Sequence, residues 1–239
     1  MIYFFDGTKS GFLTAFLHAF DDPDALLTSK KAQLTLGQTP VFIQTDESKA
    51  ARALQRLCSF DCEFEHDLDF LLRSGMENNE QIAFRYVRFL AKIKRPIRNQ
   101  LAESDVFAAV ECMKKIGLEI HHFHGFIRFM ETQSGVLYAP FSPDNDICDL
   151  LVPHFRARLP QYPFVLHDVK RKTAAVYDGK NCFIAPLDKA DVLLSADETE
   201  WQALWKKYYN AVNIPSRERL KQMRGFMPVR YWKFMPEKQ

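Results

Sequence analysis

The segment PFVLHDVKRKTAAVYDG (163–179) gives the clearest indication of the structure of the second half of the chain. Phe164–Asp168 and Thr173–Tyr177 are short apolar runs with β-branched and aromatic residues, a composition that is typical of strands. Asp178 and Gly179 then form a turn signal directly after the second run. The stretch therefore predicts two strands that are neighbours in one sheet.

The segments on either side of this pair extend the sheet. We predict strands over 126–130, 136–139 and 182–185, and helices over 144–158, 199–212 and 217–223. Pro153 should kink the first of these helices or end it early. The β-β-α-β-β order predicts an antiparallel sheet with a helix on one face. The tail that begins at Arg224 is rich in aromatic residues, so we expect it to dock on the fold.

The first half of the chain predicts a β-α-β-α portion followed by a central helical pair. The expected strands cover 2–5 and 41–43, the expected helix starts are Ser10 and either Asp46 or Ser48, and the helical pair covers 79–93 and 104–124. Between these elements, acidic residues alternate with other residues over 61–69. We interpret that run as an edge strand or a solvated acidic turn, with a metal-binding acidic face as the less favoured alternative.

The whole chain is predicted to be an α+β protein. It has 239 residues, of which 47% are hydrophobic and 26% charged, which excludes a disordered or low-complexity chain. We expect a single compact unit over 1–239, with a subdivision into 1–100 and 101–239 as the alternative. Five widely spaced cysteines argue against a disulfide framework or a cysteine-rich metal centre. No secretory or membrane-spanning segment is found, so we expect a cytoplasmic protein without membrane contact, resident metal or cofactor.

Charge is distributed unevenly along the chain. Residues 1–84 hold 7 basic and 13 acidic residues, a net charge of −6. Residues 85–98 hold six basic residues and no acid, and residues 204–239 hold nine basic and two acidic residues, a net charge of +7. Basic residues interleaved with aromatic ones suit phosphate contact and base stacking. The alternative is that these residues are structural or form a solvated face.

We therefore select a set of nucleic-acid-binding candidates. They are Arg85, Arg88, Lys92, Arg95, Arg98, Arg128, Arg158, Arg224, Arg230, Trp232 and Lys233. Arg128 is predicted in a strand, where it could bind phosphate or form an ion pair with Asp168 or Glu131. Arg158 ends a predicted helix, where a basic residue is also expected from the helix dipole.

Catalytic residues are not assigned by any complete motif, because nucleotide-binding glycine loops, the serine-hydrolase elbow and H-E-x-x-H are all absent. Four candidates remain, namely Glu119, His121, His154 and Asp168. The histidine run HHFH (121–124) suits a helix C-terminus as well as acid–base, phosphate or metal chemistry. A stand-alone hydrolase acting on nucleotides or DNA ends would need the four candidates in one pocket.

Several longer motifs carry a family resemblance. They include EIHHFHGFIRF (119–129), HFRARLP (154–160), IPSRERLKQM (214–223) and MPVRYWKFMPE (227–237). In these the chain resembles a bacterial family described as probable DNA metabolism proteins, built around a domain of unknown function. The resemblance implies a DNA-associated accessory or processing factor that works with a radical-SAM repair or modification protein. It supplies no catalytic residues, and a protein-interaction subunit without nucleic-acid contact is the remaining alternative.

Overall fold

The computed structural model describes residues 1–30, 40–214 and 219–239, and it confirms the α+β class. The chain divides into two compact units, 1–117 and 118–239. This boundary lies inside a helix, α5 (Ser104–Phe126), rather than near residue 100. One helix therefore supplies residues to both units. No described helix has the length and apolar character needed to cross a membrane.

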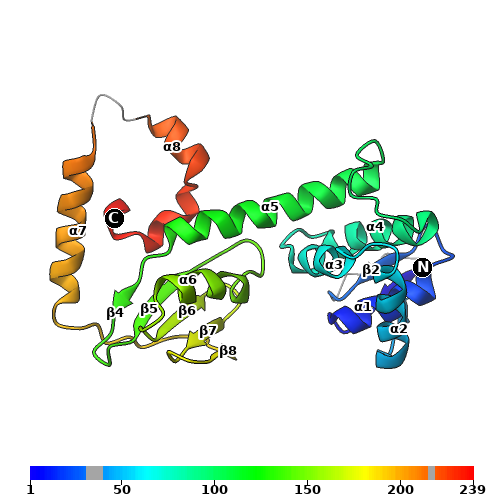
Figure 1. Ribbon diagram of the computed structural model, residues 1–239, viewed down its shortest axis with the longest axis horizontal. Helices are drawn as coiled ribbons and strands as arrows, with labels where there is room; N and C mark the ends of the chain where they lie inside the picture. Colours follow the sequence, from blue (N-terminus) through cyan, green and yellow to red (C-terminus); the bar gives the residue numbers. More distant parts are fainter. Residues whose placement is uncertain (31–39, 215–218) are drawn as a thin grey trace. The chain divides into compact units, whose positions relative to one another are not determined.

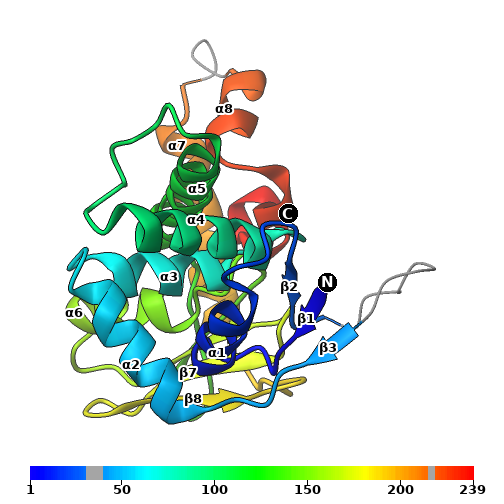
Figure 2. The same ribbon diagram turned by 90° about the vertical axis from the view of Figure 1, so that its right-hand side faces the viewer.

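The first unit contains a small parallel sheet (Figure 1; Figure 2). Its central strand β1 (Ile2–Phe4) lies between β2 (Leu26–Thr28) and β3 (Pro40–Phe42). The sequence prediction missed β2. Helix α1 (Lys9–Ala19) follows β1, and its N-cap is Thr8 rather than Ser10, because the Thr8 side chain accepts a hydrogen bond from the Gly11 amide at 2.9 Å.

Helix α2 (Glu47–Cys58) begins after Asp46, whose carboxylate caps it by accepting from the Lys49 amide at 3.0 Å. The acidic run at 61–69, predicted to be a strand or turn, instead enters helix α3 (Phe64–Arg73). The reason lies in the apolar residues Phe64, Leu68 and Leu71, which are fully buried at helical spacing. The alternating acids obscured this period in the sequence.

Asp67 of α3 is completely buried and therefore needs partners. It accepts hydrogen bonds from the Tyr86 hydroxyl at 2.8 Å and from Arg98 at 3.2 Å. Burial raises the pKa of Asp67, although both of these partners favour its charged form. Tyr86 lies on α4 (Asn79–Ile93), the helix that the sequence predicted with these bounds. The bond thus joins α3 to α4 inside the core.

The second unit contains a five-stranded sheet in the order β4-β5-β6-β7-β8. The strands are β4 (Met130–Glu131), β5 (Leu137–Phe141), β6 (Phe164–Asp168), β7 (Thr173–Tyr177) and β8 (Cys182–Pro186). The predicted antiparallel sheet is wrong in one respect, because β5 and β6 are parallel. Their connection contains the short helices η1 (Asp149–Leu151) and α6 (Val152–Arg158), and such a crossover returns the chain to the same end of the sheet.

Two further predictions, of the strand around Arg128 and of the helix over 144–158, are wrong. Helix α5 runs to Phe126, so Arg128 lies in the irregular segment before β4 and not in a strand. The helix predicted over 144–158 is divided, because Pro153 occupies the first turn of α6, where its missing amide proton costs no helical bond.

The chain ends in helical segments. They are α7 (Glu198–Val212), α8 (Leu220–Phe226), η3 (Val229–Phe234) and η4 (Pro236–Lys238). The helix predicted over 217–223 begins in part outside the described residues, since 215–218 are not among them. The tail does dock, because Tyr231 and Met235 retain only 2% and 1% of their exposure. We call residues 227–239 the C-terminal tail.

We predict that Tyr86→Phe destabilises the first unit. The substitution keeps the ring but removes the hydroxyl donor, so a buried oxygen of Asp67 loses its partner, at a cost of about 1–3 kcal/mol. Urea unfolding followed by circular dichroism measures this loss. Tyr3→Phe is the matched control, since the Tyr3 hydroxyl faces only a methionine sulfur. Equal midpoints for the two variants would contradict the assigned role of the Asp67 bond.

Candidate functional site

Glu119 of α5 is a buried carboxylate whose oxygens are fully occupied. It accepts from the Asp144 amide at 2.8 Å, and from the Asn145 amide and side chain at 2.9 and 2.7 Å. A further bond comes from the Tyr231 hydroxyl at 2.8 Å. Burial, followed by the charge of Glu119, raises the pKa of Tyr231, so this hydroxyl stays protonated as a donor. Glu119 therefore fixes a loop and the C-terminal tail onto α5.

Asp168 supports the same loop from the end of β6. It is completely buried and accepts from the amides of Lys170 and Arg171, and Arg171 adds an ion pair at 3.0 Å. The Arg171 guanidinium also donates to the backbone oxygen of Pro143 at 3.2 Å. Glu119 and Asp168 are thus brought to one loop, where both hold backbone and side chains in place.

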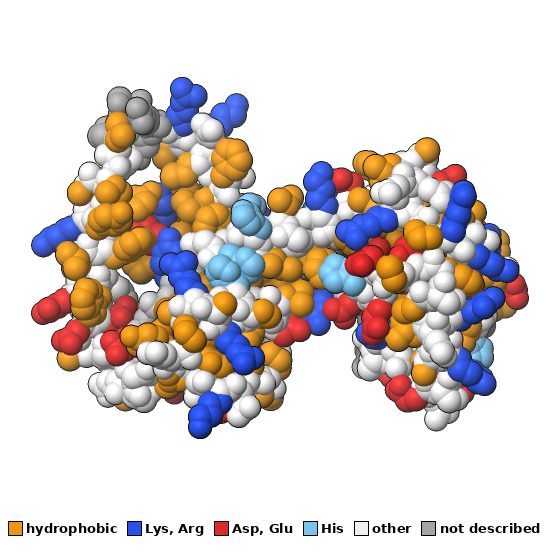
Figure 3. Space-filling view, viewed as in Figure 1, with side chains coloured by type: hydrophobic (Ala, Val, Ile, Leu, Met, Phe, Trp, Pro, Cys, Tyr) orange, Lys and Arg blue, Asp and Glu red, His pale blue; other side chains and the backbone are white. Residues whose placement is uncertain are grey.

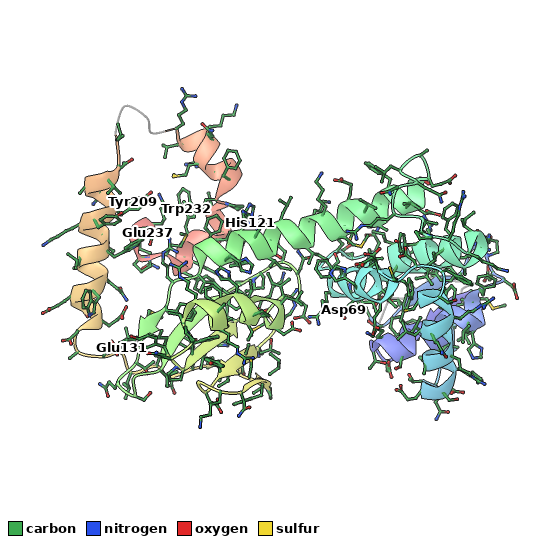
Figure 4. All side chains as sticks on the ribbon, in the orientation of Figure 1. Asp69, His121, Glu131, Tyr209, Trp232 and Glu237 are labelled. Atoms are coloured by element: carbon green, nitrogen blue, oxygen red, sulfur yellow. The ribbon has the colours of Figure 1, made fainter. Side chains whose placement is uncertain are left out.

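The histidine candidates take different positions. His121 is exposed on α5, as labelled in Figure 4. His154 of α6 instead stacks on His124, with ring centroids 4.0 Å apart and an interplanar angle of 11°. The Nε2 atom of each of these two rings is buried and has no hydrogen-bond partner. Burial, and then the neighbouring His154 and His121, lower the pKa of His124. Across residues 1–30, 40–214 and 219–239, no three His, Cys, Asp or Glu residues are grouped to hold a metal.

Arg128 has a partner that the sequence analysis did not identify. Its guanidinium binds Glu237 of the C-terminal tail at 2.6 and 3.0 Å, and the Glu237 side chain is 1% exposed. The same guanidinium lies 5.5 Å from the Trp205 ring centroid. The expected ion pair with Asp168 or Glu131 is wrong, since Asp168 pairs with Arg171. Arg128 joins the tail to α7.

A second tail contact reaches α7 near its C-terminal end. The Lys238 amine donates to the Tyr209 hydroxyl and lies over the rings of Tyr209 and Trp232, at 4.6 and 5.4 Å. Figure 4 shows Tyr209 of α7 facing Trp232 and Glu237 of the tail. The tail therefore bridges α5, through Tyr231, and α7.

Beside this bridge lies a cavity of about 450 Å³, which we call the α7 pocket. Two tryptophans and two arginines line it, namely Trp201, Trp205, Arg128 and Arg158. Trp201 is 60% exposed and Trp205 is 38% exposed. Gln202 also lines the pocket, with its amide nitrogen held by Glu198 at 2.8 Å. Because that nitrogen faces a carboxylate, the Gln202 amide has a fixed orientation.

The tryptophans belong to a longer exposed surface, the α7 aromatic face. It consists of Trp201, Leu204, Trp205, Tyr208 and Val212, each at least 38% exposed. The sequence predicted this amphipathic spacing. In a globular fold such a face is normally covered, but here Figure 3 shows hydrophobic side chains exposed along α7. The Trp205 and Tyr208 ring centroids are 5.6 Å apart.

The predicted phosphate-binding arginines of the first unit differ in availability. Arg88 donates to the Phe20 backbone oxygen at 3.0 Å, and Arg98 binds buried Asp67. Arg85 lies 3.9 Å from Asp105. Lys92 and Arg95 are exposed. Structural partners therefore occupy part of the basic run at 85–98.

The same division holds for the candidates in the second unit. Arg230 pairs with Asp144 at 2.8 Å, and Trp232 donates to the Met227 backbone oxygen at 3.0 Å. Lys233 lies over the Phe234 ring at 4.6 Å but is exposed, as is Arg224 on α8. Arg158 is exposed at the rim of the α7 pocket, and no described carboxylate forms an ion pair with it.

A family model matches more than half of the chain. Residues 77–237 match the model of DUF4130, a domain of unknown function. No curated protein matches the chain, and no solved structure matches it. The match includes α4, all of the second-unit sheet, the α7 pocket and nearly all of the C-terminal tail.

We predict that acid releases the C-terminal tail. Burial alone would raise the pKa of Glu237, but hydrogen bonds, first from Arg128, lower it below the ordinary 4.5. Because the pKa of Glu237 is lower in the folded state, its ionised carboxylate stabilises the docked tail at pH values above the unfolded-state pKa. This stabilisation is lost as the pH falls through the folded-state pKa. Limited proteolysis of the tail across pH 3–6 measures this release. The Glu237→Gln variant should show a flatter pH profile over the same range. Identical pH profiles for the wild-type chain and Glu237→Gln would contradict the role of the Arg128–Glu237 ion pair in docking the tail.

Proposed function

The chain belongs to the DUF4130 family, and from that premise we propose that it binds single-stranded nucleic acid in the α7 pocket. The observation that carries the proposal is the pairing of two exposed tryptophans with an exposed, unpaired Arg158 around a cavity of about 450 Å³. A cavity of this size is at the lower end of small-ligand pockets, and it accommodates an unstacked base.

The tryptophans supply stacking surfaces. Trp201 and Trp205 are four residues apart and therefore lie on one face of α7, with Tyr208 one turn further on. Aromatic rings arranged in this way can stack successive bases, at about 1–3 kcal/mol per base. Stacking of this kind requires bases whose faces are open, which a duplex does not offer. The geometry therefore favours single strands.

The arginines have separate roles in this proposal. Arg128 is neutralised by Glu237 and lies against Trp205, so it positions that ring. Arg158 has no such partner in the described part of the chain and is the phosphate contact. Lys206 and Lys207 are exposed on α7 and provide further positive charge for the phosphates of the bound nucleic acid. Asp197, Glu200 and Lys207 line a second cavity beside Trp201, where Lys207 offsets part of the acidic charge.

The identity of the nucleic acid rests on the resemblance described under Sequence analysis. It favours DNA, a cytoplasmic setting and a radical-SAM repair or modification protein as partner. The hydrolase alternative has less support, because Glu119 and Asp168 have their oxygens occupied by structural donors. The exposed α7 aromatic face also suits a protein-interaction subunit, and binding measurements distinguish the two functions.

We predict that Trp201→Ala weakens binding of a single-stranded oligonucleotide at least fivefold, because one stacking surface is lost. Fluorescence anisotropy at several salt concentrations measures this loss. Arg158→Ala should reduce the salt slope by about one. The matched control is Tyr162→Ala, because Tyr162 is an aromatic residue of similar exposure outside the pocket lining, and this variant should change neither quantity.

Two outcomes would overturn the proposal. One is unchanged affinity in a folded Trp201→Ala variant. The other is an absence of binding by the wild-type chain at low salt, and this result would favour the protein-interaction subunit.

A further inference from the structure

The second-unit sheet has an uncovered edge at β8. The strand order ends with β8, and no described segment pairs with its outer side. Edge strands are normally protected by charged side chains or by a covering segment. The five residues of β8, CFIAP, carry no charge, and Phe183 and Ile184 are each 51% exposed. The two residues lie on opposite faces of the sheet.

Two backbone hydrogen bonds of the β7–β8 hairpin show which backbone groups face outward. The Leu187 amide donates to the Lys172 oxygen at 2.8 Å, and the Asp178 amide donates to the Asn181 oxygen at 3.1 Å. Antiparallel strands alternate between bonded and non-bonded pairs, so Phe183 and Ala185 direct their backbone groups toward β7. The backbone groups of Cys182, Ile184 and Pro186 therefore face the open edge.

We propose that β8 pairs antiparallel with β8 of a second copy of this chain, centred on Ile184. In this register the amide and oxygen of Ile184 bond with those of Ile184 in the second copy. The Cys182 amide donates to the Pro186 oxygen, once from each copy. Pro186 has no amide proton, which limits the pairing to this short segment. The two sheets become one continuous sheet across the dimer.

Charge complementarity selects a second copy as the occupant. Lys180 precedes Ile184 by four residues, and Asp188 follows it by four. In an antiparallel pairing centred on Ile184, Lys180 in the turn before β8 and Asp188 just after β8 come near each other from different copies, at each end of the paired segment. Asp188 is 66% exposed while it contacts Lys172 at 2.8 Å, so its carboxylate remains accessible to a second cation. A shift of register separates these opposite charges.

Sedimentation velocity of the full chain over a concentration series tests the proposal. We expect a reversible monomer–dimer equilibrium. Ile184→Pro should abolish the dimer without unfolding the chain, because the amide it removes faces outward rather than toward β7. Circular dichroism checks the fold. This experiment is independent of nucleic-acid binding, because Ile184 does not line the α7 pocket.

A charge exchange supplies the second test. Lys180→Asp places like charges opposite each other and should raise the dimer dissociation constant about tenfold. The double variant Lys180→Asp with Asp188→Lys restores the opposite charges and should recover dimerisation. A wild-type chain that is monomeric at all concentrations would overturn the proposal. A dimer that survives both Ile184→Pro and Lys180→Asp would also overturn it, because the copies would then meet elsewhere.

Discussion

The buried carboxylate of Glu119 is the interaction on which the second unit depends. Four hydrogen bonds from the loop at 144–145 and from Tyr231 satisfy a charge that would otherwise be costly to bury. Because Tyr231 anchors the C-terminal tail, the tail can reach Arg128 through Glu237 and α7 through Lys238. The tail, fixed at Glu119, thus contributes Pro236 to the lining of the α7 pocket and binds Arg128 there through Glu237. A residue that looked like a catalytic candidate in the sequence has a structural role in positioning the candidate binding surface.

Ion pairs within the fold reduce the number of basic residues that are available to bind phosphate. Counted along the sequence, the basic segments suggest an extended phosphate-binding surface. In the folded chain, Arg98, Arg128 and Arg230 each bind a carboxylate. An arginine that is already paired contributes little net field, although it can orient a neighbouring ring, as Arg128 orients Trp205. The cations that remain available near aromatic rings are fewer, and Arg158 is the one that lines the α7 pocket.

Local patterns predicted local structure well and tertiary pairing poorly. The strands β6 and β7 and the helix α4 have the predicted bounds, because their periodicity and end signals agree. Helix α3 was missed because alternating acids resembled a strand, although two of them, Asp61 and Asp67, are buried. The parallel pairing of β5 and β6 depends on where the crossover returns, which residue spacing does not encode. The bond between Glu119 and Tyr231 joins residues 112 positions apart, so no local signal identifies it. The exposure of the α7 aromatic face could likewise not be predicted from the sequence, because it depends on which elements pack against α7.

Hydrogen–deuterium exchange on the full chain, with and without a single-stranded oligonucleotide, tests whether nucleic acid binds at the α7 pocket. We predict slower exchange in α7 and in the C-terminal half of α6, where Trp201, Trp205 and Arg158 lie. Protection confined to the basic segment 85–98 of the first unit would contradict it, because binding would then take place away from the α7 pocket.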